Sequence, residues 1–68
     1  MSRGCPLLLV LGRLCVEQQL WGKAKSFLEA SLALHETRAA NIELARLHEQ
    51  LDELMLATRR YQAAALLP

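Results

Sequence analysis

Aromatic residues are scarce in this chain of 68 residues, which has one Trp, one Tyr and one Phe. A surface that stacks single-stranded bases needs several aromatic side chains, so their scarcity argues against that function. An excess of one charge is also lacking, because eight Lys and Arg residues stand against seven Asp and Glu residues. The basic residues are scattered, whereas nucleic-acid-binding proteins show a basic stripe. We therefore expect no nucleic-acid partner.

Residue patterns typical of catalysis are missing as well. The sequence has one aspartate and three serines, and it contains no Gly-rich phosphate loop, nucleophile elbow or His–Glu metal motif. The residues that could ligate zinc lack the short paired spacings of zinc sites: Cys5, Cys15, His35 and His48. We expect no enzymatic activity, no cofactor and no metal.

A membrane span and an internal disulfide are not expected either. The apolar run Leu7–Leu11 ends at Gly12, which is too short for a bilayer-crossing helix. On one helix, Cys5 and Cys15 would lie ~15 Å apart along the axis, beyond disulfide reach. Both cysteines are therefore expected to be reduced.

Helix-forming residues dominate what is present. Ala, Leu, Glu, Gln, Arg and Lys are abundant and β-branched residues are few, which favours α-helix. We predict four helices, near 6–18, 20–34, 38–51 and 53–67. Pro6 suits a first helical position, and Thr37 is the expected N-cap of the third helix.

The apolar residues within these helices recur with the period of an amphipathic helix. Each helix is therefore expected to turn one side inward. The predicted inward side chains are Leu7, Leu8, Leu11, Leu14, Cys15, Trp21, Ala24, Phe27, Leu28, Ser31, Ile42, Leu44, Ala45, Leu47, His48, Leu51, Leu54, Ala57, Tyr61 and Ala64.

Part of the sequence occurs twice at one constant offset. Leu11-Gly12-Arg13-Leu14 recurs as Leu44-Ala45-Arg46-Leu47, and at the same offset Ala24 and Leu28 match Ala57 and Tyr61. A period of about 34 residues is typical of helix–turn–helix solenoid units. The small residues at matching positions predict close approach between the two helices of each unit.

These residues resemble the tetratricopeptide repeat. That family has a large residue, Leu and a small residue in the first helix of each repeat, then Ala, an aromatic residue or Leu, and Ala in the second helix. The first copy gives Leu8, Leu11, Gly12, Ala24, Leu28 and Ser31 at these positions. The second copy gives Asn41, Leu44, Ala45, Ala57, Tyr61 and Ala64. The resemblance implies an all-α fold of two helix–turn–helix repeats, about 5–37 and 38–68, in a right-handed α-solenoid fragment of four antiparallel helices. The chain departs from the pattern at three kinds of position: Gln19 and Asp52 for the turn Gly, Glu36 for Pro, and Asn41 for a large apolar residue.

A narrower resemblance is to the C-terminal repeats of the HemY family. It rests on Leu11–Cys15, on Gln19–Ala24 with its Trp21-Gly22, and on Leu28–Leu34 and Glu43–Leu47. The family implies a bacterial protein associated with protoheme biosynthesis and anchored in the inner membrane, of which this chain would be a soluble part. Within that association, Cys5-Pro6 is a candidate thiolate ligand of heme, although a loop Cys before a helix-starting Pro is the simpler interpretation.

The first helix of each tetratricopeptide repeat lines a concave groove that binds partners. Carried over by position, the expected groove residues are Leu9, Arg13, Val16, Glu17, Ile42, Arg46, Glu49 and Gln50. Arg13 and Arg46 recur in register and could grip a carboxylate, which would make the partner an anionic peptide. The alternative is that both arginines are solvated or paired with Glu17 and Glu49.

Self-association is the remaining expectation. The chain is 53% hydrophobic, and a chain this short cannot bury that much apolar surface alone. Two repeats are fewer than the three that usually give a stable array, which predicts a homodimer or contact with neighbouring repeats. Three functions thus stay open: a protein-interaction scaffold, a module contacting heme or a heme-pathway enzyme, and a purely self-associating helical domain.

Overall fold

Four α-helices make up the part of the chain that this computed structural model describes, residues 6–68. They are α1 (Pro6–Glu17), α2 (Trp21–Leu34), α3 (Arg38–Gln50) and α4 (Leu54–Ala65). No strand occurs in these residues, and none of these helices has the length and apolar character needed to cross a membrane. The predicted all-α class with four helices is confirmed.

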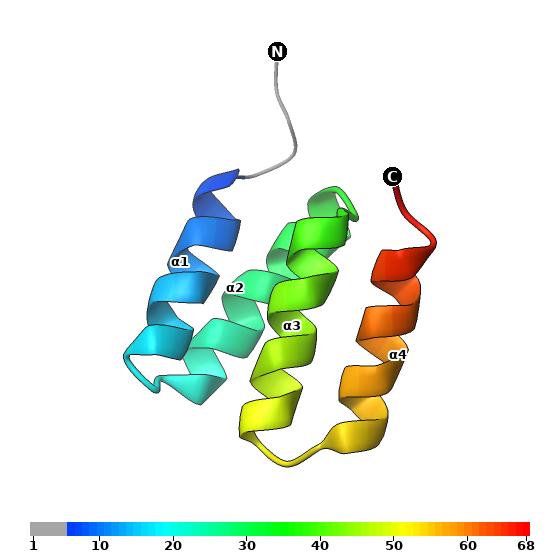
Figure 1. Cartoon of the computed structure of the whole chain (residues 1–68). Helices are drawn as coiled ribbons and strands as arrows, with labels where there is room; N and C mark the ends of the chain where they lie inside the picture. The colour runs from blue at the N-terminus through cyan, green and yellow to red at the C-terminus, as the bar shows by residue number, and fades with distance from the viewer. Residues whose placement is uncertain (1–5) are drawn as a thin grey trace.

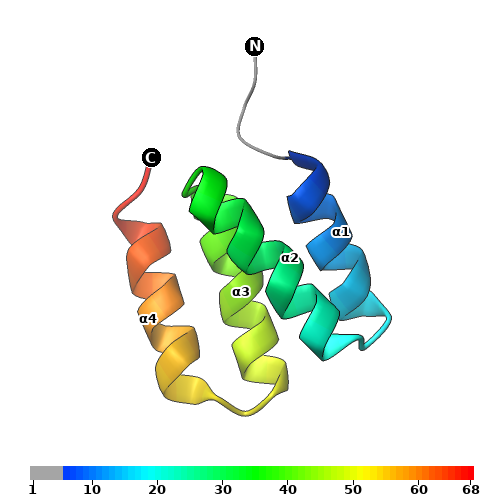
Figure 2. The same ribbon diagram turned by 180° about the vertical axis from the view of Figure 1, so that it is seen from behind.

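Successive helices run antiparallel, so that α1 and α2 form one hairpin and α3 and α4 form another (Figure 1). The hairpins meet where α2 packs against α3, and α1 also contacts α3. The two views place α1 and α4 at opposite edges of the molecule (Figures 1 and 2). Because successive helices alternate in direction, α1 and α3 run parallel to each other.

Each hairpin turns through the same backbone motif. The amides of Gln19 and Leu20 donate to the carbonyls of Val16 and Cys15, at 3.0 and 2.8 Å. At the equivalent place in the second hairpin, the amides of Asp52 and Glu53 make the corresponding bonds, at 3.0 and 2.8 Å. This is the pairing of a Schellman cap, which needs a left-handed residue after the helix. Gln19 and Asp52 supply it, with φ of 61° and 63°.

The N-terminus of α3 is capped as predicted. The Thr37 hydroxyl oxygen accepts a hydrogen bond from the Ala40 amide at 3.1 Å. The extended backbone of Thr37 places its side chain back over the first turn, as an N-cap requires.

The core lies between the two hairpins and is built from small and large aliphatic residues. Ala24 and Leu28 of α2 pack with Leu44 and Leu47 of α3 in one buried cluster. Ala40 is fully buried although the apolar pattern did not include it. The predicted inward residues that are buried are Ala24, Leu28, Ser31, Leu44, Ala45, Leu47, His48, Ala57 and Ala64.

Four predicted core residues are exposed, and the prediction was wrong for them. Leu7 and Leu14 on α1 are 68% and 49% exposed, and Leu54 and Tyr61 on α4 are 60% and 36% exposed. Amphipathic spacing identifies the apolar side of a helix but not whether another helix covers it. These residues lie on the two edge helices, and no further helix of the described residues packs there.

Asn41, which stands where the repeat pattern has a large apolar residue, is fully buried with its amide paired. Its Nδ2 donates to Glu36 Oε2 at 3.0 Å and to the Thr37 carbonyl at 3.3 Å. Its Oδ1 accepts from Nη1 of Arg60 at 2.9 Å. A buried amide is tolerated when it is hydrogen-bonded in this way, so the side chain ties the start of α3 to α4.

Gly12 permits the close approach of α1 and α2. A Cβ at this position would lie 2.5 Å from Cδ2 and 2.7 Å from Cγ of Leu28. Leu28 is fully buried and has little room to move aside. The predicted role of a small residue at this position is confirmed.

We expect Gly12→Ala to lower the free energy of unfolding by about 1–3 kcal/mol, because an added methyl overpacks a filled site. Gly22→Ala is the matched control, since nothing lies within 4 Å of a Cβ there. It should leave stability unchanged or raise it by up to about 1 kcal/mol through helix propensity. Urea denaturation followed by circular dichroism measures both. Equal effects of the two substitutions would contradict the close approach.

We expect Gln19→Gly to raise the free energy of unfolding by about 0.5–1 kcal/mol, and Asp52→Gly to do the same, because glycine removes the Cβ penalty of the left-handed conformation. The greater freedom of glycine in the unfolded chain offsets part of that gain. Gln18→Gly, one residue earlier, should lower stability instead. Thermal melts of the three variants test the order, and stabilisation by Gln18→Gly would contradict it.

Candidate functional site

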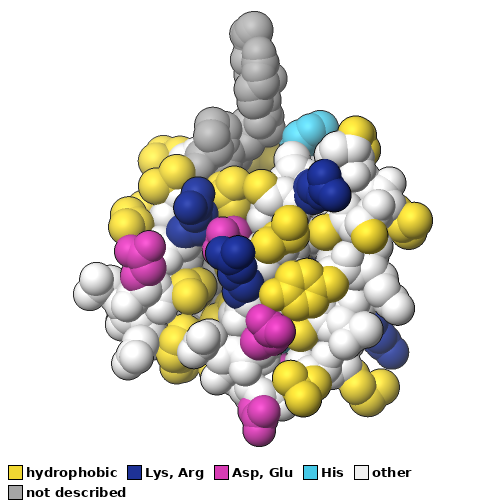
Figure 3. All heavy atoms as spheres, viewed as in Figure 1, with side chains coloured by type: hydrophobic (Ala, Val, Ile, Leu, Met, Phe, Trp, Pro, Cys, Tyr) yellow, Lys and Arg dark blue, Asp and Glu magenta, His cyan; other side chains and the backbone are white. Residues whose placement is uncertain are grey.

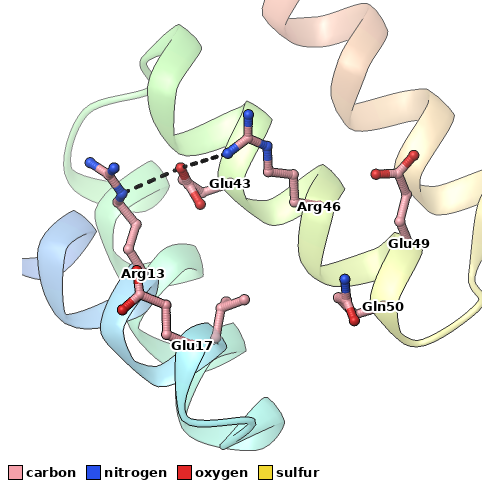
Figure 4. Close-up of a pocket in the computed structure, with 7 residues that line it drawn as sticks. Arg13, Glu17, Glu43, Arg46, Glu49 and Gln50 are labelled. Carbon is pink, nitrogen blue, oxygen red and sulfur yellow. Dashed lines mark ion pairs between the residues drawn. The ribbon is translucent and has the colours of Figure 1, made fainter.

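A groove of about 400 Å³ lies between the parallel helices α1 and α3. Arg13, Val16 and Glu17 of α1 line one wall, and Glu43, Arg46, Glu49 and Gln50 of α3 line the other (Figure 4). The regular pitch of each helix explains the set, because residues three or four apart share a face. We refer to this feature as the α1–α3 groove.

Most of the predicted groove residues line the α1–α3 groove: Arg13, Val16, Glu17, Arg46, Glu49 and Gln50. Leu9 and Ile42 do not line it. Leu9 is half-buried because it packs against the core cluster, and Ile42 is also half-buried. The residues that line the groove are therefore more polar than the predicted set.

Glu43 is the groove residue that the sequence did not predict. Its Oε2 lies 3.4 Å from Nε of Arg13 and 3.7 Å from Nη1 of Arg46, so one carboxylate faces both arginines (Figure 4). Comparison of the two copies does not identify Glu43, because the equivalent residue of the first copy is Val10. The i,i+3 spacing of Glu43 and Arg46 was the available signal.

Arg13 and Arg46 form their ion pairs with Glu43, so the part of the alternative interpretation that paired them with Glu17 and Glu49 was wrong, while the part that left both arginines exposed to solvent agrees with the structure. Both guanidinium groups stay accessible, since the side chains of Arg13 and Arg46 are 57% and 62% exposed. The Glu43 side chain is only 14% exposed. Ion pairs of exposed arginines contribute tenths of a kcal/mol to about 1 kcal/mol, so a ligand carboxylate can compete with Glu43.

The α1–α3 groove carries charge of both signs, with two arginines and three glutamates. Arg13, Glu43 and Arg46 gather at one end, while Glu17 and Gln50 lie further along the helices (Figure 4). In the space-filling view, two basic side chains flank an acidic one on this face, among hydrophobic side chains (Figure 3). The groove is thus suited to a segment with an anionic group at one end and hydrogen-bond donors at the other.

Glu49 is held by α4 and not by an arginine. The Tyr61 hydroxyl donates a hydrogen bond to Glu49 Oε1 at 2.9 Å. This hydrogen bond raises the pKa of Tyr61 above its ordinary value, with smaller contributions from desolvation and from the negative charge of Glu49, and the nearby Arg46 guanidinium offsets part of the rise. The contact fixes the Glu49 side chain at the rim of the α1–α3 groove.

The other candidate residues are accounted for by packing. His48 is buried, which confirms its predicted inward position, and its Nδ1 lies 2.8 Å from Glu53 Oε1. Cys15 is a half-buried free cysteine against the core. Residues 6–68 contain no cluster of His, Cys, Asp or Glu that could hold a metal. The candidate heme ligand, Cys5, lies outside the described residues.

Comparison with protein-family models, curated proteins and solved structures finds no match to this chain. The resemblances to the tetratricopeptide repeat and to the HemY family stay predictions from the residues that carry them.

The contact between Tyr61 and Glu49 predicts an abnormal titration. We expect Tyr61, the single tyrosine, to ionise at a higher pH than a free tyrosine, because the phenolate would lose its hydrogen bond and face a carboxylate. Any stability from this bond is present below the ordinary pKa and is lost as the pH rises through the raised pKa. The ultraviolet absorbance of the phenolate follows the titration.

Glu49→Ala should return the pKa of Tyr61 toward its ordinary value, and Glu17→Ala is the control at an exposed groove carboxylate that Tyr61 does not contact. A normal titration in the unmodified chain, or equal shifts in both variants, would contradict the contact.

Proposed function

We propose that this chain is a non-catalytic protein-interaction module that holds a segment of a partner protein in the α1–α3 groove. The observation that carries the proposal is the position of Arg13 and Arg46. They occupy equivalent places in the two copies of the repeat, on neighbouring parallel helices, and both reach one groove. Two guanidinium groups in register are suited to bidentate recognition of a carboxylate.

The partner segment proposed here presents a carboxylate to the end of the groove that holds Arg13 and Arg46. Glu43 already faces both arginines, so it acts as the internal competitor of that carboxylate. Donors on the ligand would meet Glu17, Glu49 and Gln50 further along the groove. A free chain terminus or a peptide with an acidic residue and a neighbouring donor satisfies both ends, whereas a uniformly acidic segment would be repelled by the glutamates.

The fold assignment proposed with this function is a pair of tetratricopeptide-type hairpins. Support comes from the constant offset between the two copies, the matched turns at Gln19 and Asp52 and the small Gly12 against Leu28. The narrower assignment to a HemY-like bacterial protein rests on the sequence runs around Trp21 and Glu43.

A panel of short labelled peptides with free C-terminal carboxylates, each paired with its C-terminal amide, tests the function by fluorescence anisotropy. We expect the peptides that bind to lose about tenfold in affinity on amidation, or about 1.4 kcal/mol. Arg13→Gln combined with Arg46→Gln should abolish the preference for the carboxylate and leave the helical signal intact. Glu43→Gln should strengthen binding, because the competing carboxylate is removed.

The control is Arg38→Gln combined with Arg59→Gln, which makes the same change of charge at two exposed arginines that do not line the groove. It should bind as the unmodified chain does. Equal loss in both double variants would reduce the effect to net charge, and no discrimination between acid and amide would rule out carboxylate recognition.

A further inference from the structure

The two copies of the repeat differ in burial at matching positions of α1 and α3. Ala40 and Leu47 of α3 are fully buried, and Leu47 packs with Ala24 and Leu28 of α2. The equivalent residues on α1, Leu7 and Leu14, are 68% and 49% exposed. In α3, Leu47 of this face packs against α2, whereas in α1 the corresponding face has no covering helix among the described residues.

The complementary difference separates α2 from α4. Leu28 is fully buried, and Trp21 and Leu32 pack against the core. Their equivalents on α4 are Tyr61, Leu54 and Ala65, all exposed, with Tyr61 at 36% and Leu54 at 60%. The face by which α2 covers α3 is therefore present a second time on α4, where no helix of the described residues other than α3 lies beside it and the Tyr61 hydroxyl reaches back to Glu49 of α3.

We infer that a second copy of this chain stacks head-to-tail on the first, with α4 of one copy covering α1 of the next. The contact would repeat between copies the packing of α2 on α3 within each copy. Both halves of that packing exist in every chain, at opposite edges of the molecule (Figures 1 and 2). The inference rests on this internal precedent and not on the α1–α3 groove.

The chemistry of the α1 face favours such a contact. Leu7, Val10 and Leu14 are spaced three and four residues apart and are all exposed, so they form one apolar stripe. Val10 stands where α3 has Glu43, which means that this stripe has no carboxylate to desolvate. On α4, Leu54 and Tyr61 share the facing stripe with the uncharged Thr58.

The symmetry of this contact differs from that of the homodimer expected from the sequence. A homodimer with two-fold symmetry uses one surface twice, whereas head-to-tail stacking uses two different surfaces and leaves one of each unpaired at the ends. Copies can therefore continue to add, and the assembly is open and depends on concentration.

Two charge substitutions test the inference by sedimentation velocity of the full chain. We expect the unmodified chain to form a series of growing species. Leu14→Glu blocks the α1 face and Leu54→Glu blocks the α4 face, so each variant alone should be monomeric, with self-association weakened on the order of 100-fold. An equal mixture of the two should form a 1:1 complex and nothing larger, because each variant retains the half that the other lacks.

Leu20→Glu is the matched control. Leu20 is 46% exposed, close to the 49% of Leu14, and the equivalent residue of the second copy is already Glu53. This variant should assemble as the unmodified chain does, and circular dichroism should show equal helicity in all variants. A monomeric unmodified chain, self-association of either blocked variant alone, or failure of the mixture to form a complex would overturn the inference.

Discussion

The contact between Gly12 and Leu28 is the constraint on which the arrangement of the helices depends. Because residue 12 has no Cβ, α1 approaches α2 closely enough for Leu28 to be covered from that side. Leu28 also belongs to the buried cluster with Leu44 and Leu47 of α3, so one side chain joins three helices. Arg13 follows Gly12 directly and comes to face Glu43. The groove is therefore positioned by the packing beneath it.

The sequence predicted the elements well where local rules decide. Helical propensity and the internal repeat located four helices, and the Thr37 cap follows from the chemistry of one turn. The same rules failed for Leu7, Leu14, Leu54 and Tyr61, since apolar spacing does not say whether a neighbour is present. In the groove, alignment of the two copies predicted that Arg13 and Arg46 lie on the same side. The same alignment did not predict Glu43, because the equivalent residue of the first copy is Val10. An interaction that only one copy makes cannot be found by comparing the sequences of the two copies.

Two departures from the expected repeat pattern belong to a single interaction. Glu36 stands where Pro is usual and Asn41 stands where a large apolar residue is usual, and Asn41 donates a hydrogen bond to Glu36. Considered one at a time, each residue weakens the resemblance. Considered together, they replace apolar packing at the start of the second hairpin with a polar contact that also includes Arg60. That two such departures contact each other can be recognised only from the structure.

The buried amide of Asn41 has a consequence for how the second hairpin moves. Its oxygen accepts from Arg60 on α4, and its nitrogen donates to the segment before α3. Sliding α4 along α3 by one turn would leave a fully buried polar group without a partner, which costs about 1–3 kcal/mol. Aliphatic contacts alone tolerate such sliding far better, because one methyl group replaces another. Asn41 therefore fixes the position of α4 along α3. The second hairpin is expected to move as one rigid unit.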